Sequence, residues 1–140
     1  MKLLLSATLM LILTFSTSSF GIEFMPEISP EARKIAATEV VKAPNTVAVY
    51  ARGLCCASCA IGIRKKLVKI DVIDLTRFNQ GIELDPKTQL VHIALKPGTR
   101  LPHKAVAQAI LDAGYDAVQV YSMKKGQLHV ALLAEPKKDA

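Results

Sequence analysis

The stretch 46–123 alternates between strand-like and helix-like patterns in an order that few folds share. Short runs rich in β-branched and aromatic residues favour strands, and longer amphipathic runs favour helices. The strand patterns are TVAVYA (46–51), GIELD (81–85), QLVHIAL (89–95) and YDAVQVYSM (115–123), and the helical patterns cover 58–70 and 102–114. This order predicts an α+β fold, a ferredoxin-like βαββαβ sandwich with two helices on one face of an antiparallel sheet. LHVALLA (128–134) predicts an extra C-terminal strand.

The same periodicity predicts which side chains fill the space between sheet and helices. One face of the sheet is expected to contribute Val47, Val49, Val91, Ile93, Leu95, Val118 and Val120. The helices are expected to contribute Ile61, Leu67, Val106, Ile110 and Leu111. His92 alternates with Val91 and Ile93, so it is expected on the opposite, exposed face of the sheet rather than at a ligand site.

The N-terminal residues 1–21 have the composition of a secretory signal peptide. One early cation, Lys2, precedes an apolar run over 3–15 and a small polar stretch over 16–19. The run is shorter than the ~20 residues that span a bilayer. Ser19 and Gly21 occupy the small-residue positions before a cleavage site, so we expect cleavage after Gly21 and a periplasmic or secreted protein. The alternative is an uncleaved anchor, the one case in which the protein would be membrane-bound.

Between the signal peptide and the domain at 46–123, residues 22–45 are expected to form a leader with a short helix. Ser29 suits the N-cap position and Pro30 the first helical position. The apolar residues Ile35, Val40 and Val41 are too few to require that this helix be buried. Residues 124–140 form a C-terminal extension.

The formal net charge is +6, which raises the question of a nucleic-acid partner. Aromatic residues make up only 5% of the chain and tryptophan is absent, and export argues against such a partner. We therefore expect no nucleic-acid binding, and interpret the basic residues after the cysteines as a solvated helix face.

All three cysteines of the chain, Cys55, Cys56 and Cys59, lie within five positions. An odd number cannot all pair within a monomer, and cysteines in one loop cannot staple distant segments. Positions three apart at a helix start face the same way, and the helix N-terminus stabilises thiolates. Arg52 and Arg64 are expected to add to that positive field. Thiolates select soft ions such as Cu(I) and, by the same logic, Hg(II).

Of two other interpretations of these cysteines, a structural zinc site and a thiol–disulfide redox protein, only the second remains open. A structural zinc site needs four ligands, and no second CxxC or nearby HxxxH supplies them. A thiol–disulfide redox protein also carries CxxC at a helix start, but GLCCASCA lacks the usual Trp and the Pro between the cysteines.

GLCCASC resembles the GMxCxxC loop of the heavy-metal-associated domain family, which includes copper metallochaperones and periplasmic mercury-binding proteins. The resemblance covers 46–123 and includes LDAGYDA, similar to the turn between the family's second helix and fourth strand. It implies that Cys56 and Cys59 bind the metal and that Tyr115 lies beside the site. It also implies a membrane metal transporter or metal-transporting ATPase as partner. Leu54 replaces the family's Met, and Cys55 stands where the family has Thr or another small residue.

The leading hypothesis is therefore a non-enzymatic carrier or scavenger of Cu(I) or Hg(II) outside the cytoplasm. The alternatives are a thiol–disulfide protein that uses Cys56 and Cys59, and an interaction domain without metal traffic. For Cys55 three roles are open: an auxiliary third sulfur, a thiol that exchanges with a Cys56–Cys59 disulfide, and a small packing residue.

Overall fold

The computed structural model describes residues 27–133, with only the backbone included for residues 57 and 59. The expected signal peptide and the last residues of the C-terminal extension lie outside this part. The elements are α1 (Pro30–Val41), β1 (Thr46–Arg52), α2 (Ala57–Leu67), β2 (Ile82–Asp85), β3 (Leu90–Ala94), α3 (His103–Asp112), β4 (Asp116–Lys124) and β5 (Gln127–Leu132). Within the described residues, no helix has the length and apolar character needed to cross a membrane.

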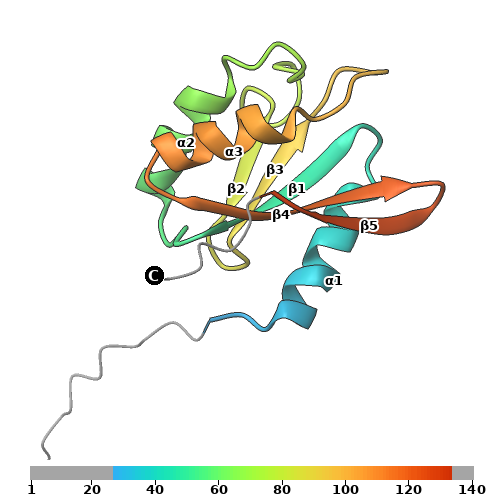
Figure 1. Ribbon diagram of the computed structural model, residues 1–140, viewed down its shortest axis with the longest axis horizontal. Helices are drawn as coiled ribbons and strands as arrows, with labels where there is room; N and C mark the ends of the chain where they lie inside the picture. Colours follow the sequence, from blue (N-terminus) through green and yellow to red (C-terminus); the bar gives the residue numbers. More distant parts are fainter. Residues whose placement is uncertain (1–26, 134–140) are drawn as a thin grey trace, which may run out of the picture.

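One antiparallel sheet with the strand order β2-β3-β1-β4-β5 forms the centre of the molecule. Helices α2 and α3 lie together over one face of it (Figure 1). The four strands β1 to β4 with these two helices form the α+β, ferredoxin-like arrangement that the sequence predicts. The predicted extra strand is present as β5, which forms the edge of the sheet beside β4.

The helices α2 and α3 bury a narrower stripe than the sequence pattern suggested. Leu67, Val106 and Ile110 are fully buried, as predicted. Ile61 and Leu111, predicted to be core residues, are 53% and 52% exposed. Each lies one position beyond a buried residue, and one position turns a side chain by about 100° around a helix. Ala60, Ile63 and Ala109 complete the buried stripes instead.

A β-bulge in β4 changes which of its side chains face the helices. Tyr50 of β1 pairs with Gln119, but the next residue, Ala51, pairs with Ala117, so Val118 is the extra residue. Val118 was predicted to face the helices together with Val120. Val120 does so, whereas Val118 packs on the opposite face of the sheet, because the bulge shifts the alternation by one residue.

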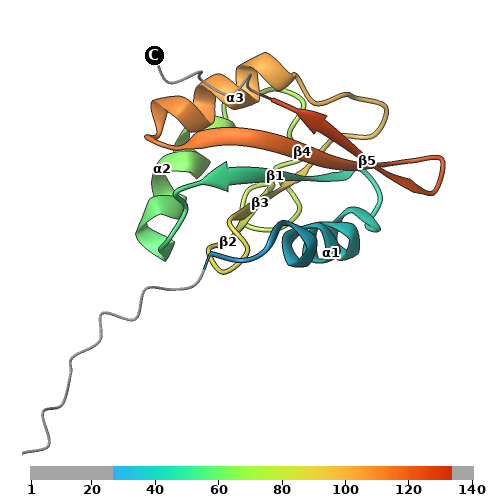
Figure 2. The same cartoon turned by 60° about the horizontal axis from the view of Figure 1, so that its bottom comes forward.

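The opposite face of the sheet is covered by α1, as Figures 1 and 2 show from two directions. The predicted cap is present, because Ser29 Oγ accepts a hydrogen bond from the Ala32 amide at 3.2 Å. Ala37 and Val41 pack there in a second buried cluster with Ala48, Tyr50, Leu90 and Tyr121.

The expectation that this helix needs no burial is therefore wrong. Ile35 is indeed 67% exposed. The expectation considered only the large apolar residues of the helix, but alanines and the aliphatic part of an arginine side chain can also be buried. Ala37 is buried and Arg33 is only 4% exposed.

His92 lies on this second face, opposite Ala48 of β1 and Glu83 of β2. The prediction of an exposed sheet residue is wrong, since only 12% of the His92 side chain is exposed. The alternation in the sequence predicted the correct face, but α1 shields that face from solvent.

Candidate functional site

The cysteine loop leaves the end of β1 through a turn that is anchored in the core. Gly53 has a positive φ of 89°, which a residue without a Cβ adopts at no steric cost. The Leu54 amide then donates to the Ala51 carbonyl at 3.3 Å, and the Leu54 side chain is fully buried. Leu54 therefore fixes the base of the loop, and the cysteines follow directly after this anchor.

Cys55 and Cys56 have different surroundings although they are neighbours. Cys55 is exposed, and Cys56 is partly buried in an extended conformation, with φ −152° and ψ 161°. The Cys56 Sγ lies 3.1 Å from the Ser58 Oγ. Ser58 was not singled out from the sequence; a hydroxyl two positions after a helix-capping residue is the signal that could have identified it.

Cys56 is the N-cap residue of α2, and the backbone places residue 59 third in the helix. In a capping box the side chains at these two positions each accept from the backbone amide of the other, so both positions lie on the same side of the helix start. The first turn carries no acidic residue, so no carboxylate opposes the positive end of the helix. Such a position favours the thiolate form of cysteine, which is the form that binds metal.

Tyr115 reaches the cysteine loop from the end of α3. The Gly114 amide donates to Leu111 at 2.8 Å and the Tyr115 amide donates to Ile110 at 3.1 Å, which closes α3 in a Schellman motif. A Cβ on Gly53 would lie 3.6 Å from Tyr115 Cδ1, so the ring packs against the turn before the cysteines. The α3–β4 and β1–α2 connections lie at the same end of the sheet (Figures 1 and 2).

The two arginines expected to strengthen the positive field both lie near an acidic residue. Arg52 is exposed and lies directly across from Asp116 in the β1–β4 ladder, where opposite charges offset each other. Arg64 lies two turns into α2 and lines a small hollow with Phe78 and Glu83. The positive end of the α2 dipole, by contrast, lies at Cys56 itself, which is the N-cap residue.

The histidines of the chain lie away from the cysteine loop. His103 begins α3 and shares a hollow with Thr46, at the start of β1, so it lies at the end of the sheet away from the cysteine loop. His129 of β5 lines the same hollow. Among the described side chains, no group of three or more His, Cys, Asp or Glu residues is arranged to hold a metal ion. The structure thus brings together Cys56, Ser58 and the backbone of residue 59, and places Tyr115 against the turn at Gly53 that precedes them.

Comparison with protein-family models, with curated protein sequences and with solved structures finds no match to this chain.

Proposed function

We propose that this protein is an exported, non-enzymatic carrier or scavenger that binds a soft metal ion, Cu(I) or Hg(II), through Cys56 and Cys59. The observation that carries the proposal is the position of Cys56 at the N-cap of α2 with residue 59 third in the same helix. The resemblance of GLCCASC to the heavy-metal-associated loop independently selects the same two cysteines.

The ligand chemistry supports a soft ion over zinc. Two thiolates satisfy an ion that accepts few sulfur ligands, whereas a structural zinc site requires four ligands. Within the described part of the chain, His92, His103 and His129 all lie on other surfaces than the cysteine loop.

The exposure of the loop supports a role in metal transfer. Cys55 is exposed and Cys56 only partly buried, so thiols of a partner protein can approach the cargo ion directly. Ligand exchange between the two proteins then passes the ion without releasing it to solvent. The protein that receives the ion is a membrane metal transporter or metal-transporting ATPase that presents its own cysteines.

Competition for Cu(I) with a chromophoric chelator tests the proposal under anaerobic conditions. Cys56→Ser and Cys59→Ser should each weaken Cu(I) binding by about a hundredfold or more, because a hydroxyl is a poor ligand for a soft ion. Ile61→Ser, at a 53% exposed position of the same helix outside the cysteine loop, is the matched control and should change the affinity by less than about threefold. Unchanged affinity in either cysteine variant would contradict the assignment.

A thiol–disulfide function of the same cysteines predicts a different result in a second assay. The proposed carrier should not accelerate the reduction or oxidation of a disulfide substrate. Rapid disulfide exchange together with no affinity for Cu(I) or Hg(II) would show a redox function in place of the carrier function.

The proposed export is tested separately by mass spectrometry. The mass of the exported protein should correspond to a chain that begins at or near Ile22.

A further inference from the structure

An open hollow of about 960 Å³ lies at the end of the sheet opposite the cysteine loop. Two additions to the ferredoxin-like core form much of its wall. The end of α1 contributes on one side, and the β4–β5 hairpin on the other. Ser122 is the last β4 residue that pairs with β1, opposite Val47, so the hairpin that follows extends beyond the start of β1. We call this hollow the distal groove.

The charged side chains that line the distal groove all have one sign. Lys42, Arg100, Lys124 and Lys125 line it together with His103 and His129, and its lining includes no aspartate or glutamate. Lys42 is already paired with Glu39 at 2.6 Å. In the described part of the chain, Arg100, Lys124 and Lys125 take part in no ion pair, so these cations remain available to an anion.

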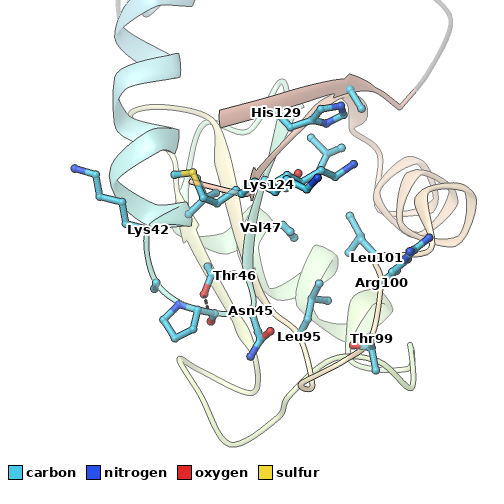
Figure 3. Close-up of a pocket in the computed structure, with 18 of the residues that line it drawn as sticks. Lys42, Asn45, Thr46, Val47, Leu95, Thr99, Arg100, Leu101, Lys124 and His129 are labelled. Carbon is cyan, nitrogen blue, oxygen red and sulfur yellow. Dashed lines mark hydrogen bonds between the residues drawn. The ribbon is translucent and has the colours of Figure 1, made fainter. Parts of the chain in front are cut away.

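The floor of the distal groove is apolar. Val47, Leu95 and Leu101 lie between Lys124 and His129 on one side and Thr99 and Asn45 on the other (Figure 3). Val47 and Leu95 belong to the main core and keep only 7% and 6% of their surface exposed. A ligand that covers this floor therefore needs an apolar body as well as a charge.

The start of α3 adds to the positive potential of the distal groove. His103, its first residue, lines the groove. The N-cap is Pro102, whose side chain has no acceptor for the first amides, and the first turn contains no acidic residue. Helix N-termini with this composition favour negative charge nearby.

We propose that the distal groove binds a small amphiphilic anion, with a carboxylate or phosphate head group near Arg100 and Lys124 and an apolar body on Val47, Leu95 and Leu101. The volume falls in the range of about 300–1,000 Å³ that is typical of small-molecule sites. This site is separate from the cysteine loop, and its ligand is independent of the metal ion.

Isothermal titration calorimetry of the purified protein with decanoate and decyl phosphate tests the proposal. Both ligands should bind. Decanol, which has no charge, and inorganic phosphate, which has no apolar body, should each bind at least about tenfold more weakly. Across the series from hexanoate to decanoate, each added methylene that is buried should tighten binding about fourfold.

Two double variants with the same change in net charge distinguish binding in the distal groove from a general attraction of anions to a basic protein. Arg100→Glu with Lys124→Glu should weaken decanoate binding about tenfold or more. Lys65→Glu with Lys66→Glu, at exposed positions of α2 outside the groove, should weaken it less than about twofold. Circular dichroism and the Cu(I) affinity of both variants report whether the fold and the cysteine loop are retained.

Three results would overturn this inference. One is the absence of decanoate and decyl phosphate binding, and another is equal weakening by the two double variants. The third is binding to anionic phospholipid vesicles without any binding of the free amphiphiles, which would assign the basic surface to a membrane instead. None of these results depends on whether the cysteine loop binds copper.

Discussion

The guanidinium carbon of Arg33 lies 3.6 Å from the centroid of the Tyr50 ring. Through this contact, α1 places a cation on an aromatic ring of the central strand β1. The Arg33 guanidinium also donates to the Thr88 carbonyl at 3.0 Å and to Gln89 Oε1 at 3.3 Å, in the turn between β2 and β3. The helix is therefore bound to the sheet at two places, by the ring and by the turn.

Replacement of Arg33 by alanine should lower the free energy of unfolding by about 2–4 kcal/mol, because it removes a buried cation–π contact and leaves buried acceptors unpaired. Lys34→Ala, at the next, exposed position of the same helix, should change it by less than about 0.5 kcal/mol. Urea unfolding measures both. Equal midpoints for the two variants would show that the contacts of Arg33 with Tyr50 and the β2–β3 turn do not stabilise the fold.

The order of strands and helices was predictable because each element has a residue pattern that can be recognised within its own segment of the sequence. Alternation in 46–51 and 89–95 and helical spacing in 102–114 identify strands and helices without knowledge of their neighbours. The burial of Arg33 was not predictable, because it depends on Tyr50 and on the β2–β3 turn, which are distant in sequence. The bulge at Val118 was missed for a related reason: nothing in an alternating strand marks the residue at which its pairing shifts.

At the cysteine loop, the helix start was predictable from local pattern, whereas the position of Tyr115 near the loop was expected only from the resemblance of LDAGYDA to a turn of the heavy-metal-associated family. The position of Asp116 opposite Arg52 was missed, since the two residues lie side by side only after β1 and β4 pair. The distal groove was also missed. Its wall comes from α1 and the β4–β5 hairpin, whose positions relative to the core the sequence does not specify.

Gly81 is expected to be the glycine least tolerant of substitution. It has a positive φ of 82°, and a Cβ at this position would overlap Ile73 Cγ2 and lie 2.7 Å from the Asp74 carbonyl oxygen. Gly81→Ala should lower the free energy of unfolding by about 3 kcal/mol or more. A Cβ added to Gly62 in α2 would meet no atom within 4 Å, so Gly62→Ala should raise it by about 0.5–1 kcal/mol. Thermal or urea unfolding distinguishes the two, and a stable Gly81→Ala protein would contradict the packing described for this turn.

His92 should make the protein less stable in weak acid. Burial lowers the pKa of His92 below its ordinary value of 6.5, and the nearby carboxylates Glu83 and Asp85 oppose this effect only in part. Between the folded and unfolded pKa values the unfolded state binds more protons, so the free energy of unfolding falls as the pH drops below about 6.5. Measured from pH 7.5 to 5, this fall should be smaller in His92→Gln than in the exposed control His103→Gln. An identical pH dependence in both would exclude His92 as its source.

Tyr115 should slow the loss of Cu(I) from the cysteine loop, because its ring packs on the turn at Gly53. Tyr115→Ala should accelerate Cu(I) transfer to a chelator by about tenfold, in the range found for residues that support metal ligands. Tyr115→Phe keeps the ring and should transfer Cu(I) at close to the original rate. Stopped-flow absorbance under anaerobic conditions measures the rates. If the alanine variant matches the wild type, Tyr115 serves only to pack the end of α3.

X-ray absorption at the copper edge of the Cu(I)-loaded protein tests the central claim most directly, because it counts the ligand atoms. The proposed site predicts a copper ion bound only by sulfur, with two sulfurs if Cys56 and Cys59 act alone and three if Cys55 joins them. Cys55→Ser should then leave two sulfurs in either case, whereas Cys56→Ser and Cys59→Ser should each remove one. Copper bound mainly by nitrogen or oxygen, or a sulfur count that Cys56→Ser and Cys59→Ser leave unchanged, would contradict the proposed metal site.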